Sequence, residues 1–248
     1  MTLDRIAVLS DVHGNLTALS AVLADIEARG ITRIFNLGDT VGKGPRGSAA
    51  VDVCAERCEV NVRGNWDEWL PGSLAAEIHG AVAWWRAELR ADQLDWLASR
   101  PFSHDLLVSG RAMRFFHASA DSVLHRVRVV HTDDEFAGMF VNTEATGDGT
   151  PPTVVGYGDI HDVYVKVRDG RTLFNVGAVG NPLDEPTAPY VIVEGVAGSS
   201  SPGPFGLQLV RVPYDIDAEI AAGRALDAPE MDAYELELRE GVYRGRPT

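Results

Sequence analysis

The sequence predicts an α/β fold with two β-sheets, formed by one domain that spans residues 1–248. Three observations support this prediction. Apolar strands alternate with helical segments over the first 65 residues, which favours strands joined by helical crossovers. Residues 66–100 are rich in Trp and Ala and are typical of helices. Short strands separated by turn residues follow them, and 248 residues suffice to bury a full core.

The first part of the chain supplies the β-α-β-α-β alternation. The segment "RIAVLS" reads as a buried strand. In the helix that follows, Leu16, Leu19, Leu23 and Ile26 recur at helical spacing, and Gly30 provides the C-cap. The strand "ITRIFNLGD", the helix "GPRGSAAVDVCAERC" and the strand "EVNVRGN" complete the series. Each of the three strands runs into a polar turn.

The second part of the chain is predicted to be mainly β. Six strands are separated by turn signals: "DLLVSG", "RAMRFFHAS", "PTVVGYGD", "HDVYVKV", "RTLFNVG" and "PYVIVEG". The tetrapeptide "RDGR" predicts a hairpin turn, and "GVAGSSSPGPFG" predicts a flexible surface loop. A last strand, "LQLVRVPYD", precedes two terminal helices over residues 216–241.

The net charge of −14 restricts the partners that we expect. Such an acidic surface repels phosphates, so nucleic acid is not expected as a partner. No apolar run approaches the roughly 20 residues that span a bilayer, so no membrane association is expected. The first residues carry no export signal and there are only two cysteines, which indicates a cytoplasmic protein of undetermined oligomeric state.

Polar residues that can bind metals follow successive predicted strands, where open α/β sheets place their sites. One such residue alone would read as a turn former or a helix cap. Five strand ends that carry such residues are a stronger signal, because turn chemistry does not call for imidazoles. Hard oxygen ligands and borderline nitrogen ligands together suit Mn, Fe or Zn ions. The candidate ligands are Asp11, His13, Asp39, Asn65, His117, Asp159 and His161.

The order and spacing of "DVHGN", "GD", "GNWD", the His of "FFHAS" and "GDIH" resemble the calcineurin-like metallophosphoesterase family. The stretches "LGDTVGKGPRG" and "FNVGAVGNP" are similar to further family motifs. The segment "PYDIDAEIAAG" is similar to the C-terminal helix entry of the small bacterial branch. The resemblance covers nearly the whole chain and implies a two-sheet β-sandwich flanked by helices.

The resemblance also implies a pair of metal ions and assigns their ligands. Asp11, His13 and Asp39 bind the first metal, and Asp39 bridges to the second. Asn65 and His117 also bind the second metal. The Gly-His-x-His motif of the family then contributes one ligand to each ion.

That last motif can be aligned in two registers. A start at Gly158 places Asp159 on the second metal and His161 on the first, and we choose it because it keeps an imidazole and the family's spacing to the next N-x-G. A start at Gly156 would instead place Tyr157 beside the second metal, where a ferric ion would give a coloured tyrosinate complex. Asp159 in place of His lowers the charge of the centre and favours Mn or Fe over Zn.

The motif "GNWD" departs from the family pattern at Trp66, where the family has a His that contacts the phosphate and assists the leaving group. An indole cannot transfer a proton. It can stack on an aromatic leaving group or base, or it can simply fill the space, and both interpretations stay open. Asp67 would orient the family's His, and here a role as a helix cap is the alternative.

The sequence therefore predicts a dinuclear metal-dependent phosphoesterase with small phosphoester or nucleotide substrates, favouring phosphodiesters or nucleotides over phosphoproteins. Asp39 and Asp67 are the candidate catalytic residues, and Asn65 and Trp66 are candidate substrate contacts. The alternative is an impaired pseudo-phosphoesterase that binds a metal, a nucleotide or a partner. A nuclease of the same superfamily is disfavoured by the acidic composition.

Overall fold

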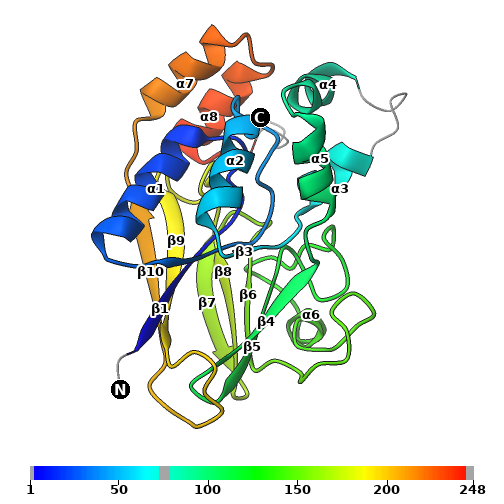
Figure 1. The fold of residues 1–248 in the computed structure, drawn as a ribbon, viewed down its shortest axis with the longest axis vertical. Helices are drawn as coiled ribbons and strands as arrows, with labels where there is room; N and C mark the ends of the chain where they lie inside the picture. The colour runs from blue at the N-terminus through cyan, green and yellow to red at the C-terminus, as the bar shows by residue number, and fades with distance from the viewer. Residues whose placement is uncertain (1–2, 73–78, 244–248) are drawn as a thin grey trace.

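The fold is described by a computed structural model that covers residues 3–72 and 79–243 (Figure 1). The strands are β1 (Asp4–Leu9), β2 (Arg33–Asn36), β3 (Val60–Asn61), β4 (Ser103–Val108), β5 (Arg111–Phe116), β6 (Val154–Tyr157), β7 (Val163–Arg168), β8 (Arg171–Val176), β9 (Ala188–Gly195) and β10 (Gly206–Val212). The helices are α1 (Leu16–Ala28), α2 (Gly47–Arg57), α3 (Asn65–Gly72), α4 (Gly80–Ala87), α5 (Ala91–Ala98), α6 (Asp133–Gly138), α7 (Ile216–Ala225) and α8 (Met231–Glu240). Of the helices predicted over 66–100, the stretch 73–78 lies outside the described residues.

The strands form two mixed five-stranded sheets. The first has the order β10-β9-β1-β2-β3, in which β1, β2 and β3 run parallel and β9 and β10 are antiparallel additions. The second has the order β4-β5-β6-β8-β7, with β5, β6 and β8 parallel and an antiparallel strand at each edge. The predicted α/β fold class with two sheets is confirmed.

The alternation of side chains along β1 explains how the first sheet is buried on both faces. Ile6 and Val8 belong to the apolar cluster between the two sheets, together with side chains of β5, β6 and β8. Ala7 and Leu9 point the other way and pack against α1 and α2. Successive residues of a strand face opposite sides, so one apolar strand serves two cores.

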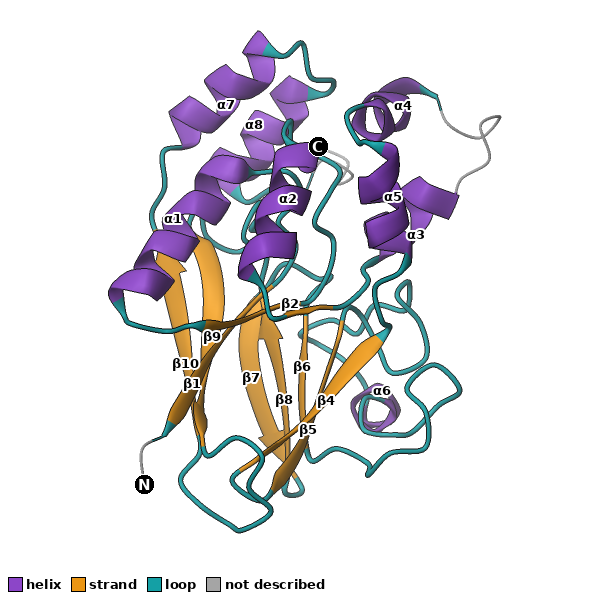
Figure 2. Ribbon diagram, in the orientation of Figure 1, coloured by secondary structure: helices purple, strands orange, loops and turns teal. Residues whose placement is uncertain are grey.

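Helices cover the outer face of the first sheet, whereas one short helix among loops lies beside the second (Figure 2). α1 and α2 pack on the first sheet, α7 packs on α1, and α8 packs on α7. The short helix α6 contributes Phe136 to the outer core of the second sheet. We did not predict α6, whose six residues are too few to show a periodic pattern. Its start is nevertheless encoded by a capping box, in which Thr132 and Glu135 bond each other's backbone N–H groups.

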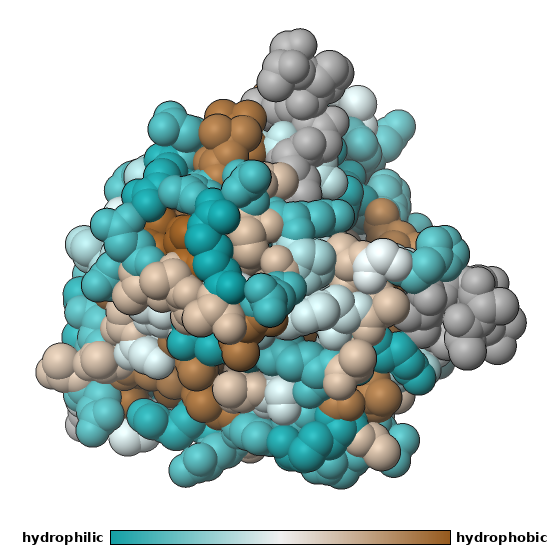
Figure 3. All heavy atoms as spheres, turned by 90° about the horizontal axis from the view of Figure 1, so that it is seen from above, coloured by the Kyte–Doolittle hydropathy of each residue, from teal (hydrophilic) through white to brown (hydrophobic). Residues whose placement is uncertain are grey.

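The face seen from above in Figure 3 is mostly hydrophilic, with separate hydrophobic groups between polar ones. In the described part of the chain, no helix combines the length and the apolarity that a bilayer crossing requires.

Candidate metal centre

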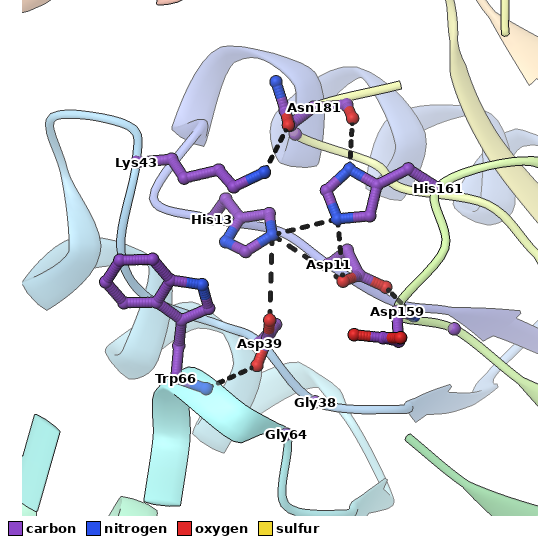
Figure 4. Close-up of polar contacts among 12 residues, drawn as sticks. Asp11, His13, Gly38, Asp39, Lys43, Gly64, Trp66, Asp159, His161 and Asn181 are labelled. Carbon is purple, nitrogen blue, oxygen red and sulfur yellow. Dashed lines mark hydrogen bonds and ion pairs between the residues drawn. The ribbon is translucent and has the colours of Figure 1, made fainter. Parts of the chain in front are cut away.

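All seven candidate ligands follow strands of the two sheets, six of them in loops and Asn65 at the start of a helix. β1 supplies Asp11 and His13, β2 supplies Asp39, and the loop after β3 leads into Asn65 at the start of α3. The second sheet supplies His117 after β5 and the pair Asp159 and His161 after β6. Figure 4 shows Asp11, His13, Asp39 and His161 directed toward one another, with Asp159 beside them.

Backbone hydrogen bonds fasten these loops together. The N–H groups of Asp11 and His13 donate to the carbonyl oxygens of Gly38 and Asp39, both at 2.9 Å. In the second sheet, the N–H of Gly158 donates to the carbonyl oxygen of His117 at 2.8 Å. The loops therefore hold each other in place, and the side chains that they carry are positioned in advance of any ligand.

Five of the candidate ligands adopt backbone φ angles in the left-handed region. The φ angles are 55° at Asp11, 48° at His13, 52° at Asp39, 62° at Asp159 and 64° at His161. Asp and His tolerate this region better than most residues, but each such position still costs about 1–3 kcal/mol. Strain concentrated at one point of the fold is typical of a functional site, where the surrounding structure enforces it.

Each of the three histidines presents Nε2 to the centre. The Nδ1–H groups of His13, His117 and His161 donate to the carbonyl oxygens of Val41 at 3.1 Å, Leu37 at 2.8 Å and Asn181 at 2.5 Å respectively. A carbonyl oxygen can only accept, so these bonds place hydrogen on Nδ1 and make Nε2 the atom that can offer its lone pair to a metal. Backbone carbonyls orient metal-binding histidines in this way.

The carboxylates of Asp39 and Asp11 each accept a backbone hydrogen bond at one oxygen, and the other oxygen points to the centre. Oδ1 of Asp39 accepts from the backbone N–H of Trp66 at 2.8 Å, and Oδ2 lies 3.8 Å from His13 Nε2 and 3.5 Å from His117 Nε2. Oδ2 of Asp11 accepts from the backbone N–H of Asp159 at 3.0 Å. The remaining oxygens of both carboxylates are therefore oriented by the backbone toward the imidazoles.

The environment of these donor atoms fits a bound cation. Oδ1 of Asp11 is fully buried and has no hydrogen-bond partner among the described residues. This oxygen lies 3.2 Å from Nε2 of His161. The Nε2 atoms of His13 and His161 are 3.3 Å apart. Burial, aided by the charge of Lys43, keeps the pKa of His13 well below its ordinary value, so its Nε2 remains an electron-pair donor. A buried carboxylate oxygen without a hydrogen-bond partner favours a bound positive charge beside it.

Two groups of side chains have the spacing of a metal site. One comprises Asp11, His13 and His161, and the other comprises Asp11, Asp39 and His117. Asp11 is thus shared between the groups, while Asp39 Oδ2 lies between His13 and His117. The amide of Asn65 adjoins the second group, 3.0 Å from His117 Nε2 and 3.3 Å from Asp39 Oδ2. The amide oxygen of Asn65 in that position would complete a donor set around a cation, and the amide nitrogen there can donate to Asp39 Oδ2.

The neighbourhood of Tyr157 bears on the two registers of the last motif. Tyr157 is a buried residue of β6 whose hydroxyl donates to the carbonyl oxygen of Val127 at 2.6 Å and accepts from the Tyr164 hydroxyl at 2.6 Å. It is directed away from the centre, whereas Asp159 and His161 lie at it. The geometry supports the register that starts with the glycine before Asp159.

Asp159 lies at the edge of the centre and differs from the other carboxylates in its partner. Its Oδ1 is 3.7 Å from His117 Nε2, and both of its oxygens accept from Nε of Arg126 at 3.1 and 3.0 Å. Burial raises the pKa of Asp159, although His117 and Arg126 oppose this effect. A metal at the second position would therefore share this carboxylate with an arginine.

Trp66 and Asp67 occupy different surroundings. The carboxylate of Asp67 is buried and accepts from the backbone N–H groups of Gly64 at 3.0 Å, Asp39 at 2.8 Å and Thr40 at 3.0 Å. This is the geometry of a cap that joins α3 to the loop after β2. The ring of Trp66 is half-buried, edge-on to His13 and packed against other tryptophans.

A pocket of about 580 Å³ opens onto the centre. Besides the candidate ligands, its walls include Lys43, Arg126 and Arg128. Nζ of Lys43 donates to the side-chain oxygen of Asn181 at 2.7 Å, and the carbonyl of that Asn orients His161. We did not predict these four residues. Lys43 and Asn181 lie within the resembling stretches "GKGP" and "GNP", but no sequence signal connects the arginines to the site.

A model of the calcineurin-like phosphoesterase superfamily domain matches residues 5–197. The chain belongs to this superfamily. Calcineurin-like phosphoesterases are hydrolases that use divalent metals, which agrees with the donor set around Asp11. The resemblance that the motifs predicted is confirmed.

Related proteins support the same family assignment and the fold. The chain is 30% identical over 235 residues to an uncharacterised protein of Methanocaldococcus jannaschii, covering 87% of this chain and 90% of that one. A metallophosphoesterase from Sphaerobacter thermophilus superposes with a TM-score of 0.73 at 27% identity, covering 96% of this chain and 99% of the other. A hypothetical protein from Pyrococcus horikoshii shares the fold, with a TM-score of 0.76 at 16% identity and the same coverage.

Proposed function

We propose that this calcineurin-like phosphoesterase is a dinuclear metalloenzyme that hydrolyses phosphodiesters or nucleotides rather than phosphoproteins. The convergence of three imidazole Nε2 atoms with the unanchored oxygens of Asp11 and Asp39 carries this proposal. Mixed nitrogen and oxygen donors suit Mn or Fe, with Zn as a further option. Two free, buried cysteines fit a cytoplasmic setting.

The proposed ligands divide between two metal positions. The first position takes Asp11, His13, Asp39 and His161, and the second takes Asp39, Asn65, His117 and Asp159. Metals bound there would activate a water molecule as nucleophile and neutralise the phosphoryl oxygens of the substrate.

The chain itself contributes positioning. Asp67 ties the backbone of Asp39 to the start of α3, so the proposed bridging carboxylate is held from both its side chain and its main chain. We assign Asp67 a positioning role, because its oxygens are occupied by backbone N–H groups. Asn65 is near enough to His117 to contact a substrate oxygen or to complete the second metal position.

The pocket supports substrates with an aromatic group next to the phosphate. Trp66, Trp69 and Tyr243 line the same pocket as the candidate ligands. Aromatic faces stack on bases or aryl groups, and the indole of Trp66 cannot transfer a proton to the leaving group. A nucleotide or aryl leaving group, which departs without an acid, therefore fits this site better than an alkyl group.

The test is hydrolysis of bis-p-nitrophenyl phosphate with added Mn²⁺. The wild-type protein is expected to turn over this diester, because nitrophenolate needs no general acid. Asp39→Asn keeps the size of the side chain but removes the charge between His13 and His117, so its turnover should fall to the background level. Metal content measured on both proteins separates lost metal from lost chemistry.

Equal background rates in both proteins would refute the phosphoesterase proposal. The lack of turnover would then be explained by Trp66 and Asp159, which replace two histidines of the family pattern. A protein that binds Mn²⁺ and nucleotide without turnover would be a pseudo-phosphoesterase.

A further inference from the structure

We propose that Arg126 is a phosphoryl-binding residue of this site, held in place by Asp159. The inference rests on the proposed function for the location of the scissile phosphate. Arg126 lies in the segment between β5 and α6, which borders the pocket that opens onto the candidate metal centre. Its side chain is 47% exposed, so it can meet a ligand in that pocket.

The wall of the pocket carries positive side chains although the protein is acidic. The protein carries a net charge of −14, and Asp11, Asp39 and Asp159 are concentrated at the centre. Lys43, Arg126 and Arg128 nevertheless line this one pocket. Cations gathered at the mouth of an acidic centre raise the local concentration of anions, which an acidic protein would otherwise repel.

Arg126 uses only one of its N–H donors to bind Asp159. Its Nε–H contacts both oxygens of Asp159 at 3.1 and 3.0 Å. Neither terminal nitrogen of Arg126 hydrogen-bonds a protein group among the described residues. A guanidinium has five N–H donors in a rigid plane, so four remain to bind phosphoryl oxygens. The nearly buried Asp159 carboxylate fixes the orientation of that plane.

The loop that carries Arg126 is anchored at Val127. Val127 is 1% exposed and packs in the outer core of the second sheet, so the flanking Arg126 and Arg128 emerge on the side of the pocket. The hydroxyl of Tyr157 donates to the carbonyl oxygen of Val127 at 2.6 Å. Tyr157, which the register that starts at Gly156 would place beside the second metal, thus holds the backbone between Arg126 and Arg128. A loop fixed at this point holds Arg126 with little loss of entropy when a ligand binds.

Arg126 and Asp159 balance each other's charge at the centre. Asp159 adds a negative charge where the resembling family has a neutral imidazole, and an unpaired carboxylate there would repel a phosphoryl group. Arg126 offsets this charge. Together the pair is neutral, and the exposed edge of the guanidinium faces the anion. Arginine forms paired hydrogen bonds with phosphate oxygens, which a lysine cannot reproduce.

The experiment compares wild-type protein, Arg126→Gln and Arg171→Gln. Arg171 begins β8, at the opposite end of the strand from the candidate centre, and is exposed, so its variant controls for the loss of one positive charge. Calorimetry gives the affinity of each protein for Mn²⁺ and then the affinity of the Mn²⁺-loaded protein for orthophosphate. Steady-state rates with bis-p-nitrophenyl phosphate give kcat and KM.

Arg126→Gln should weaken orthophosphate binding roughly 10- to 100-fold, the usual effect of losing a hydrogen bond to a charged group. KM should rise more than kcat falls, Mn²⁺ affinity should stay within about threefold, and Arg171→Gln should match the wild type in every measurement. Orthophosphate affinity within about threefold of wild type in Arg126→Gln would overturn the inference. A loss of Mn²⁺ affinity equal to the loss of phosphate affinity would also overturn it, because Arg126 would then act only by positioning Asp159 as a metal ligand.

The two proposals can fail separately. A wild-type protein that binds orthophosphate through Arg126 but hydrolyses no ester refutes the enzymatic function and supports the anion site. A wild-type protein that hydrolyses esters while Arg126→Gln binds orthophosphate normally supports the function and refutes the anion site. Wild-type protein that binds no orthophosphate refutes the anion site in either case.

Discussion

The backbone N–H of Trp66 donates to Oδ1 of Asp39 at 2.8 Å, while the indole ring of Trp66 lies edge-on to His13 with ring centroids 6.4 Å apart. The contact to the central carboxylate is therefore made by the main chain and does not depend on the side chain. The ring instead packs on Gly42 and beside Trp85. Position 66 can accept other planar side chains without loss of the hydrogen bond to Asp39.

Trp66→His should change the preference of the enzyme among leaving groups. An imidazole there can protonate a departing oxygen, as the corresponding His does in the family that the motifs resemble. General acid catalysis is worth about 10²–10⁴-fold when fully developed, so we expect at least a tenfold gain for alkyl phosphodiesters. No comparable gain is expected for p-nitrophenyl esters. The measurement is kcat/KM for both ester types in wild type and variant.

Trp66→Phe is the matched control for this prediction. It keeps an aromatic ring next to Trp85 and the backbone bond to Asp39, but it introduces no titratable group. An equal gain for both esters in Trp66→His, or the same gain in Trp66→Phe, would show that the effect comes from space in the pocket and not from proton transfer.

Much of the centre could be predicted from the sequence because its ligands follow strands. Asp11, Asp39 and His117 each come directly after an apolar segment, and parallel strands bring such positions to one edge of a sheet. The apolar run thus predicted both the strand and the position of the side chain that follows it. Apolar runs between turn residues likewise predicted the strands of the two sheets, and residues at helical spacing predicted most helices.

The remaining features depend on contacts between distant segments. Arg126 and Asn181 lie in irregular loops, and only the packed fold shows that they meet Asp159 and His161. The contacts of the Tyr157 hydroxyl could not be predicted either, because the periodicity of a strand does not show what a side-chain hydroxyl contacts. The tautomers of the three histidines follow from backbone carbonyls, which sequence letters do not describe.

Gly64→Ala should damage the centre although it adds only a methyl group. A Cβ at Gly64 would lie 2.2 Å from Oδ1 of Asp39 and 2.3 Å from its backbone nitrogen. Neither atom can yield without moving the carboxylate away from His117. We expect Mn²⁺ affinity to fall at least tenfold and the free energy of unfolding to fall by about 1–3 kcal/mol, measured by calorimetry and by chemical denaturation.

Gly138→Ala provides the comparison, because a Cβ at this last residue of α6 meets no atom within 4 Å. Its stability should equal or slightly exceed that of wild type, and its Mn²⁺ affinity should be unchanged. If Gly64→Ala bound Mn²⁺ as tightly as Gly138→Ala, Asp39 would not be held in the way that the loops indicate.

Iron-loaded protein should show no tyrosinate-to-ferric absorption band in the visible region. The hydroxyl of Tyr157 is bound to Val127 and Tyr164, away from the centre. Burial, with Tyr164 beside it, raises the pKa of Tyr157 far above its ordinary value, so the phenol stays protonated. The visible spectrum of protein loaded with Fe³⁺ tests this directly. A band that disappears in Tyr157→Phe would contradict the geometry and restore the other register.

Stabilisation by Mn²⁺ should increase with pH. Burial alone would lower the pKa of His117, but Asp39 and Asp11 outweigh it and hold this pKa well above the ordinary value of 6.5. In the metal-free protein, the proton on His117 therefore contributes stability that is fully present below pH 6.5 and is lost as pH rises through the raised pKa. Mn²⁺ uses the same Nε2 lone pair and must displace this proton, so it binds more weakly at low pH.

The thermal shift on adding Mn²⁺ should accordingly be larger at about pH 8 than at about pH 6. Calorimetry in two buffers of different ionisation enthalpy counts the protons that metal binding releases. His117→Gln should release fewer protons than wild type, because Gln carries none to displace. Equal thermal shifts at both pH values, with no proton release, would mean that the proton on His117 and the metal do not compete for Nε2. The metal would then bind through the group of Asp11, His13 and His161 alone.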